Sequence, residues 1–255
     1  MDILEHNRRA WNNEVAKGNR WTVPVDISAI RTARDGKFDL FLTPIKPVPM
    51  DWFGELRDSR VLCLASGGGQ QGPLLAAAGA CVTVFDNSDA QLQRDRDAAV
   101  KFGLNIETVQ GNMQDLGCSE DGSFDLIVHP VSNTFIDDIQ PVWREASRVL
   151  RRGGRMLSGF DNPIMHMIDW DRAEQDGTCI LKHAVPYSDA NSLSADEKAT
   201  YKRDNTPLEF GHTLAQQIAG QIAAGLAITG FYEDRGADEL DPYTDSFIAT
   251  MATKT

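Results

Sequence analysis

A run of three glycines between two short apolar segments limits the possible folds of this chain more than any other feature. Val61–Leu64 leads into Gly67–Gly69, a helix-like segment follows, and a second apolar segment, Val82–Phe85, ends on Asp86. This order is typical of a strand–loop–helix–strand unit in an open α/β sheet. In such a unit the loop backbone approaches an adenosine-bearing ligand, and the acid accepts hydrogen bonds from the ribose hydroxyls.

Two classes of cofactor fit this unit. Gly67, Gly69 and Gly72 match the dinucleotide fingerprint, and Asp86 follows Gly67 at about the 20-residue spacing expected for a nicotinamide cofactor. A glycine fingerprint of this kind occurs with several ligands, so the segments downstream decide which class is favoured.

Four downstream segments have recognisable sequence. They are Phe85-Asp86, Val109-Gln-Gly-Asn-Met113, Phe124-Asp-Leu-Ile-Val128 and Glu145-Ala-Ser-Arg-Val-Leu-Arg-Arg-Gly-Gly154. Together with the glycine loop, and in this order, they resemble the class I S-adenosylmethionine-dependent methyltransferases, especially the small-molecule branch. The resemblance runs over about residues 52–160 and returns at the C-terminus. It implies S-adenosyl-L-methionine as the cofactor and methyl transfer as the activity.

The apolar pattern predicts an α/β fold, a Rossmann-like doubly wound sheet with helices on both faces. Strands are expected at 61–64, 82–85, 106–109, 126–128, 155–159, 227–232 and 246–251. Helices are expected at 3–17, 72–79, 88–103, 139–150 and 214–226, with a Ser88-x-x-Gln91 capping box and a stop at Gly153-Gly154. A strand pair after the last helix suits a mostly parallel sheet whose last strand is antiparallel, as in the methyltransferases.

We expect a single domain over residues 1–255, made of four parts. Residues 1–55 form an N-terminal helical cap and a proline-rich connector, and residues 56–160 form the cofactor-binding core. Residues 161–210 are mixed and polar and follow the fifth strand, where insertions lie over the ligand crevice, so they are a candidate substrate lid. Residues 211–255 supply the C-terminal helix and strand pair.

The amino-acid composition limits the classes of partner that the chain can bind. The chain has 25 Lys and Arg against 37 Asp and Glu, a net charge of −12. Such a surface repels phosphate backbones, so we expect a small-molecule acceptor and no nucleic acid. No apolar stretch approaches membrane-spanning length, and the four cysteines have no paired metal spacing. These features favour a cytoplasmic protein, a monomer or homodimer, without a membrane partner.

The loop and strand ends supply the candidate cofactor-binding residues. These are Ala65, Ser66, Gly67, Gly69, Asp86, Asn87, Asn112, Met113 and His129. Asp86 can accept hydrogen bonds from the ribose hydroxyls, and the resemblance places Asn112 and Met113 against the adenine. Many relatives have an acid in place of Cys63 and a glycine in place of Ala65. Contacts to the methionine amino group are therefore expected from the backbone or the N-terminal segment.

His129 directly follows the fourth strand, at an edge that the resemblance places between cofactor and acceptor. It is our candidate catalytic residue, accepting a proton from the acceptor, or else it only lines the pocket or binds the cofactor tail. Trp11, Asn133 and Asp161 are candidate substrate contacts. Metal-dependent catechol-type relatives have an Asp-Asn pair like Asp161-Asn162, but His129 occupies the place of their third ligand. We therefore predict no metal site.

The sequence thus predicts an S-adenosylmethionine-dependent methyltransferase acting on an unidentified small molecule. Two alternatives remain open at this level. The literal glycine fingerprint allows a nicotinamide-dependent oxidoreductase, although no Tyr-x-x-x-Lys pair accompanies it. The fold also survives without chemistry, which allows a non-catalytic S-adenosylmethionine-binding protein.

Overall fold

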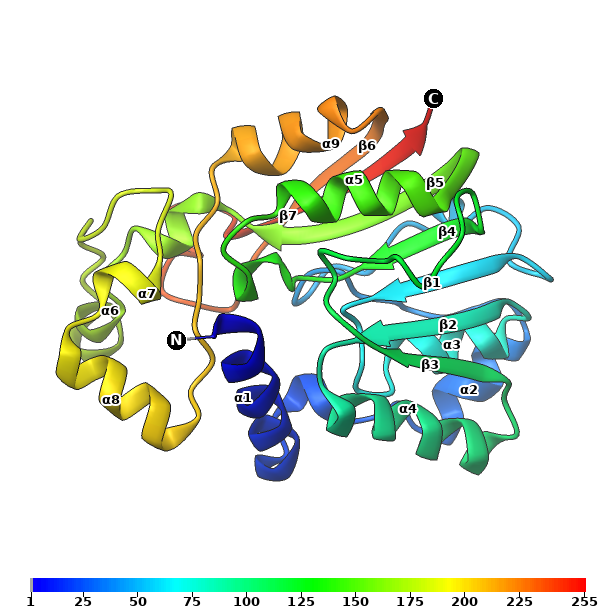
Figure 1. Ribbon diagram of the computed structural model, residues 1–255, viewed down its shortest axis with the longest axis horizontal. Helices are drawn as coiled ribbons and strands as arrows, with labels where there is room; N and C mark the ends of the chain where they lie inside the picture. Colours follow the sequence, from blue (N-terminus) through cyan, green and yellow to red (C-terminus); the bar gives the residue numbers. More distant parts are fainter. Residues whose placement is uncertain (1) are drawn as a thin grey trace.

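In the computed structural model, which describes residues 2–255, a seven-stranded sheet has helices on both faces (Figure 1). The strand order is β3-β2-β1-β4-β5-β7-β6. β1 to β5 pair in parallel, whereas β7 is antiparallel to both of its neighbours. The strands are β1 (Arg60–Leu64), β2 (Cys81–Asp86), β3 (Ile106–Gln110), β4 (Phe124–His129), β5 (Leu150–Asp161), β6 (Leu226–Asp234) and β7 (Phe247–Lys254). The predicted fold class is confirmed.

The helices surround this sheet and extend beyond one end of it. They are α1 (Ile3–Lys17), α2 (Ile27–Arg34), α3 (Gln71–Ala77), α4 (Asp89–Phe102), α5 (Gln140–Val149), α6 (Trp170–Asp176), α7 (Asp189–Ser192), α8 (Ala195–Asp204) and α9 (Gly220–Ala223). Shorter turns are η1 (Arg20–Thr22), η2 (Met50–Trp52), η3 (Asn133–Phe135), η4 (Pro163–His166) and the π-helical η5 (Ala215–Ala219). Among the helices of residues 2–255, none has the length and apolar character needed to cross a membrane.

The central position of strand β1 explains why Val61–Leu64 is an uninterrupted apolar run. Val61 and Cys63 belong to the core on one face of the sheet, with residues of α2 and α3. Leu62 and Leu64 belong to the core on the other face, with residues of α5. Because successive side chains of a strand point to opposite faces, a strand covered on both sides must be apolar at every position.

Two local predictions differ in detail from the structure. Helix α5 ends at Val149, and Gly153 lies inside β5 rather than ahead of it, with φ +70° where the strand is irregular. Only one of the two hydrogen bonds of the predicted α4 capping box forms. Ser88 Oγ accepts the Gln91 N–H at 3.1 Å, but the Gln91 Oε1 atom is buried and makes no hydrogen bond within residues 2–255.

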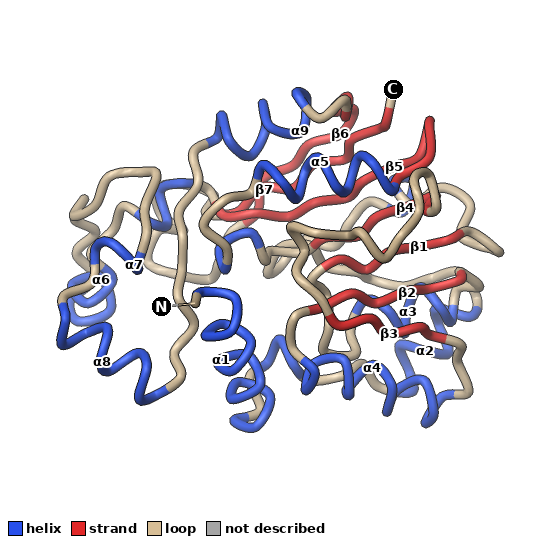
Figure 2. Tube along the Cα trace, in the orientation of Figure 1, coloured by secondary structure: helices blue, strands red, loops and turns tan. Residues whose placement is uncertain are grey.

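The segment between β5 and η5 extends away from the sheet and contains η4, α6, α7 and α8 (Figure 2). No residue of α8 is buried, and the helix has its own capping box at Ser194 and Glu197. Helix α1 lies between this segment and α4 (Figure 1). α2 was not predicted from the sequence.

Candidate active site

A cavity of about 880 Å³ lies at the carboxyl ends of the parallel strands. Residues that directly follow β1, β3 and β4 line it, together with the ends of β2 and β5, so it lies where the strand order reverses between β1 and β4. Open α/β sheets bind their ligands at this switch point. The volume falls in the upper part of the range of about 300–1,000 Å³ typical of small-molecule sites.

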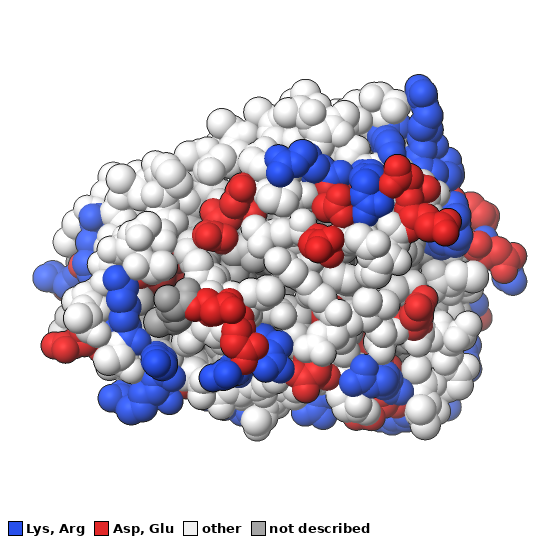
Figure 3. Space-filling view, viewed as in Figure 1, with Lys and Arg blue, Asp and Glu red and all other residues white. Residues whose placement is uncertain are grey.

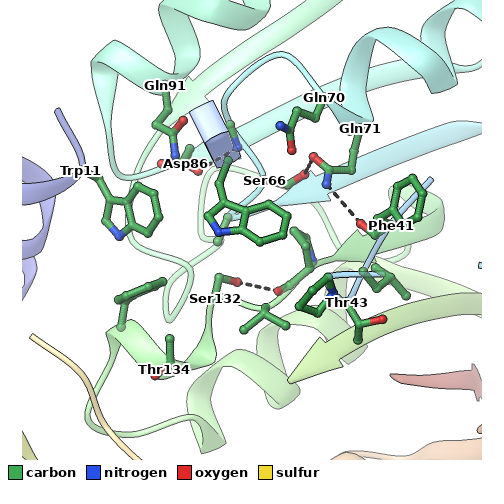
Figure 4. Close-up of a pocket in the computed structure, with 18 of the residues that line it drawn as sticks. Trp11, Phe41, Thr43, Ser66, Gln70, Gln71, Asp86, Gln91, Ser132 and Thr134 are labelled. Carbon is green, nitrogen blue, oxygen red and sulfur yellow. Dashed lines mark hydrogen bonds between the residues drawn. The ribbon is translucent and has the colours of Figure 1, made fainter. Parts of the chain in front are cut away.

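Figure 4 shows how the labelled side chains enclose this space. Trp11 and Phe41 lie on opposite sides of the view. Asp86, Ser66, Gln70, Gln71 and Gln91 lie along the upper wall, and Ser132, Thr134 and Thr43 lie along the lower one. Gln71 ties two parts of the wall together, because its side chain donates to the Phe41 carbonyl at 3.2 Å and accepts from Ser66 Oγ at 3.2 Å.

A half-buried carboxyl group and a buried one shape the glycine loop. The Gly67 N–H donates to Asp86 Oδ2 at 2.8 Å, while the Gly68 and Gly69 N–H groups donate to Asp95 Oδ2 at 2.9 and 3.2 Å. A Cβ on Gly67 would lie 2.7 Å from Gln91 Cβ, so glycine is needed there for the loop to approach α4.

Gly69 has a different role from the one predicted. It does not line the cavity, and a Cβ there would lie 2.9 Å from the Pro24 side chain. With φ +75°, this position also favours glycine through its left-handed backbone. Gly69 thus packs the loop against the segment before α2.

Asp86 lines the cavity at the end of β2, as predicted. Burial raises the pKa of this carboxyl, although the N–H groups of Ser88 and Gly67 oppose the shift by donating to it. Each carboxylate oxygen carries one of these backbone hydrogen bonds and has a second lone pair available. Asp86 therefore has free acceptor capacity at the cavity wall.

The other predicted cofactor residues near this wall are brought together. Ala65, Ser66, Gly67, Asn87, Asn112 and Met113 all line the same cavity. Asn112 Oδ1 accepts the Gln114 N–H at 3.0 Å, which holds the turn after β3. Asn87 Nδ2 donates to the Leu4 carbonyl at 2.9 Å and so links the end of β2 to α1.

His129 and Asn133 are not part of this group. His129 is fully buried, does not line the cavity, and packs its ring edge-on against Trp143 of α5 at 6.1 Å. Its Nδ1 is 2.9 Å from the Leu64 carbonyl oxygen and its Nε2 is 2.9 Å from Asn133 Oδ1. The expectation that these two side chains face a ligand finds no support in the structure.

The state of His129 follows from these contacts. Burial lowers its pKa, outweighing the hydrogen bonds that favour the charged form, so the imidazole is neutral and has one N–H. That N–H donates either from Nδ1 to the Leu64 carbonyl or from Nε2 to Asn133 Oδ1, because both partners are oxygens that accept. Asn133 Nδ2 in turn donates to Gln217 Oε1 at 3.0 Å. His129 is thus a buried anchor between β1, β4 and η3.

Trp11 and Asp161, two predicted substrate contacts, do line the cavity, at the end nearest α1 and the segment after β5. Asp161 Oδ2 is 3.1 Å from His166 Nε2. Burial alone lowers the pKa of His166, but the hydrogen bond that the imidazole donates to Asp161 and the charges of Asp161, Glu209 and Asp189 outweigh it, so the pKa is raised.

Several lining residues were not predicted from the sequence. They include Trp21, Phe41, Gln91, Met165, His166, Trp170, Glu209 and Phe247. Most belong to loops and short helices without periodicity, and only the aromatic character of Trp21 and Trp170 gave a local signal.

Comparisons with known proteins agree with this arrangement. A family profile described as a methyltransferase domain matches residues 62–158. The chain is 50% identical over 252 residues to an uncharacterized methyltransferase, YbaJ, of Bacillus subtilis, covering 99% of this chain and 98% of the relative.

Two solved structures share the fold at low sequence identity. An S-adenosylmethionine-dependent methyltransferase from Mesorhizobium loti has a TM-score of 0.61 and 18% identity, covering 80% of this chain and 94% of that one. A geranyl diphosphate C-methyltransferase from Streptomyces coelicolor, in complex with Mg²⁺, geranyl diphosphate and S-adenosyl-L-homocysteine, has a TM-score of 0.60 and 16% identity. That match covers 100% of this chain and 99% of the other.

Proposed function

The chain belongs to the class I S-adenosylmethionine-dependent methyltransferases, and from this premise we propose that its cavity holds the methyl donor at the glycine loop and a small-molecule acceptor beneath the segment 161–210. The observation that carries this proposal is the continuity of one cavity from Asp86 to Asp161. The nicotinamide-dependent oxidoreductase and the non-catalytic binder are set aside by the family assignment.

The residues around the glycine loop fit the donor. Asp86 offers free lone pairs for the ribose hydroxyls, and Asn112 and Met113 offer an amide and a polarizable surface for the adenine. S-adenosylmethionine supplies an activated sulfonium methyl group, so transfer needs chiefly positioning and exclusion of water.

The chain itself contributes to methyl transfer by enclosing the donor. Trp11 of α1 packs edge-on against Phe135 of η3, with ring centroids 4.9 Å apart, and both rings line the cavity. Aromatic walls of this kind suit a cationic donor and exclude water from it. In this proposal residues 1–55 cover the donor and residues 161–210 act as the lid over the acceptor.

Surface charge supports a small acceptor over a nucleic acid. The net charge is −12. On the face drawn in Figure 3, acidic and basic side chains are interspersed, and Lys and Arg do not form a continuous stripe. A phosphate backbone would find little attraction on such a face.

The test follows a labelled methyl group. The protein is incubated with tritium-labelled S-adenosylmethionine and a cell extract separated into metabolites, protein and nucleic acid. We expect label in the metabolite fraction, and none of it when Asp86→Ala replaces the natural chain. Transfer into protein or nucleic acid by the natural chain, lost in Asp86→Ala, would overturn the small-molecule assignment.

A further inference from the structure

A carboxylate without a partner lies at the lid end of the cavity. Glu209 belongs to the extended segment that joins α8 to η5, and it lines the cavity with Asp161 and His166. Its side chain keeps accessible surface and lines the cavity. Within residues 2–255, no group donates a hydrogen bond to its carboxylate, although its backbone N–H is bonded.

The backbone around Glu209 is held by three other elements. Asn7 of α1 accepts the Leu208 N–H at 2.8 Å and donates to the Leu208 carbonyl at 3.0 Å. The Glu209 N–H donates to Asp189 Oδ2 of α7 at 2.7 Å, and the Phe210 N–H donates to the Thr134 carbonyl of η3 at 2.7 Å. The position of the carboxylate is therefore determined by the fold and not by a free loop.

The groups around Glu209 are paired with one another and do not compensate the charge of its carboxylate. Asp161 is paired with His166 at 3.1 Å, and Asp189 accepts hydrogen bonds from the Tyr187 hydroxyl at 2.8 Å and from the Glu209 N–H. Burial raises the pKa of Glu209 to about 7; His166 opposes this shift, and the charges of Asp161 and Asp189 add to it. The other titratable groups that sense Glu209 are Tyr187 and Tyr201.

Aromatic rings complete this end of the cavity. Trp170 of α6 and Phe247 of β7 both line it, and Trp170 is held in place because its Nε1–H donates to the Met165 carbonyl at 2.7 Å. An unpaired carboxylate together with aromatic faces is a favourable environment for an organic cation and an unfavourable one for an anion.

Building on the proposed function, we propose that the methyl acceptor is a small organic amine, that Glu209 binds its ammonium group, and that the same carboxylate accepts one proton from it. The neutral amine left after this proton transfer has a free lone pair. Its nitrogen then forms the new N–CH₃ bond while the electron pair of the broken S–CH₃ bond stays on sulfur. The product is again an ammonium, and Glu209 carries the proton that was removed.

The raised carboxyl pKa suits this role. A carboxylate of ordinary acidity is a poor base for an ammonium, whose pKa resembles the value of about 10.4 for lysine. A Glu209 pKa of about 7 reduces that difference and brings the group close to the working pH of a general base.

The experiment uses three probes that share one skeleton and differ in charge: benzylamine, benzyl alcohol and benzoate. Each is titrated into the full chain with saturating S-adenosylhomocysteine at pH 8, and apparent Tm is recorded. We expect benzylamine to raise Tm and the neutral and anionic probes to leave it unchanged. Glu209→Gln should weaken benzylamine about 10- to 100-fold, since it removes a charge-assisted hydrogen bond.

Two variants control for charge and folding. Glu174→Gln makes the same change at an exposed position of α6 and should bind benzylamine as the natural chain does. Glu209→Asp keeps the charge and should bind it more weakly than the natural chain but more tightly than Glu209→Gln. Benzylamine binding should tighten as pH rises from 6 to 8, as Glu209 ionises, and this tightening should be smaller in Glu209→Gln, where the neighbouring His166 still titrates.

Other outcomes overturn the inference. Stabilisation by benzoate or benzyl alcohol equal to that by benzylamine, or a benzylamine shift that survives Glu209→Gln, would show that no cation is recognised at Glu209. Loss of the S-adenosylhomocysteine shift itself in Glu209→Gln would place the donor's amino group there instead. A natural chain with no S-adenosylhomocysteine shift would contradict the proposed function, and the probes titrated alone would still report on Glu209.

Discussion

At the scale of single residues, the N–H groups of Gly68 and Gly69 both donate to one oxygen of Asp95, at 2.9 and 3.2 Å. The other oxygen of Asp95 is buried and has no partner within residues 2–255. Burial raises the pKa of Asp95 to about 7, and the nearby charge of Asp86 adds to the shift. The glycine loop therefore depends on an acid that its own motif does not contain.

Asp95→Asn tests this dependence. Between pH values of about 4 and 7 the native state retains a proton on Asp95 that the unfolded state releases, so this group lowers stability as pH rises through that window and adds no further change above it. An amide oxygen still accepts both N–H groups but does not titrate.

We expect the Tm of Asp95→Asn minus the Tm of the natural chain to increase from pH 5 to pH 8 in thermal unfolding. Asp97→Asn, at an exposed position of the same helix, should show no such increase. A pH-independent difference for Asp95→Asn would contradict the assignment.

His129→Ala separates an anchoring role from a catalytic one. The side chain is fully buried and makes two polar contacts of 2.9 Å, so its removal should cost about 2–4 kcal/mol of unfolding free energy. Urea unfolding measures this loss. A stability change below about 0.5 kcal/mol together with loss of methyl transfer would instead identify His129 as a catalytic residue.

At the scale of elements, the segments with strong periodicity were predictable from the sequence. β1 is apolar from Val61 to Leu64 because both of its faces are covered there, and α5 places Val142, Trp143 and Ala146 in the core on one face of the sheet. The position of Asp86 at the end of β2 followed from the same pattern. These features depend on local sequence alone.

The orientation of His129 follows from the alternation of side chains along β4. Val128 belongs to the core on the α3 face and Ile127 to the core on the α5 face. Because strand side chains alternate, His129 at the end of β4 points to the α5 face of the sheet, where its ring contacts Trp143. The placement of Glu209 was not predictable in this way, because it depends on Asn7 and Asp189, which are distant in sequence.

Asn7→Ala tests the connection between α1 and the lid. Asn7 is buried and donates to the Phe135 and Leu208 carbonyls at 2.8 and 3.0 Å, so its loss should free the segment that carries Glu209. We expect faster amide hydrogen exchange over residues 208–210 and weaker benzylamine binding.

The matched control is Asn13→Ala, on the same helix, whose hydrogen bond to the Asp204 carbonyl at 3.2 Å is exposed. Equal exchange over residues 208–210 in the two variants would mean that α1 does not position Glu209.

At the scale of the whole molecule, the cavity is built from parts that are far apart in the chain. Residues of the core, of α1 and of the segment after β5 all line it. In Figure 1, α1 and that segment lie beyond the carboxyl ends of the parallel strands. A ligand that fills the cavity touches all three parts and should therefore stabilise the protein as a unit.

The central claim is that the glycine loop and Asp86 bind the sulfonium cofactor. Thermal unfolding with S-adenosylhomocysteine, compared with NADH and no ligand, tests it most directly. At about 100 times its Kd, a ligand adds about 2.7 kcal/mol of stability, which raises Tm by roughly 5–10 °C for a chain of this size.

The account predicts such a rise with S-adenosylhomocysteine, its loss in Asp86→Ala, and its retention in Asp97→Ala on the exposed face of α4. A rise with NADH alone, no rise with either ligand, or an S-adenosylhomocysteine shift that survives Asp86→Ala would contradict it.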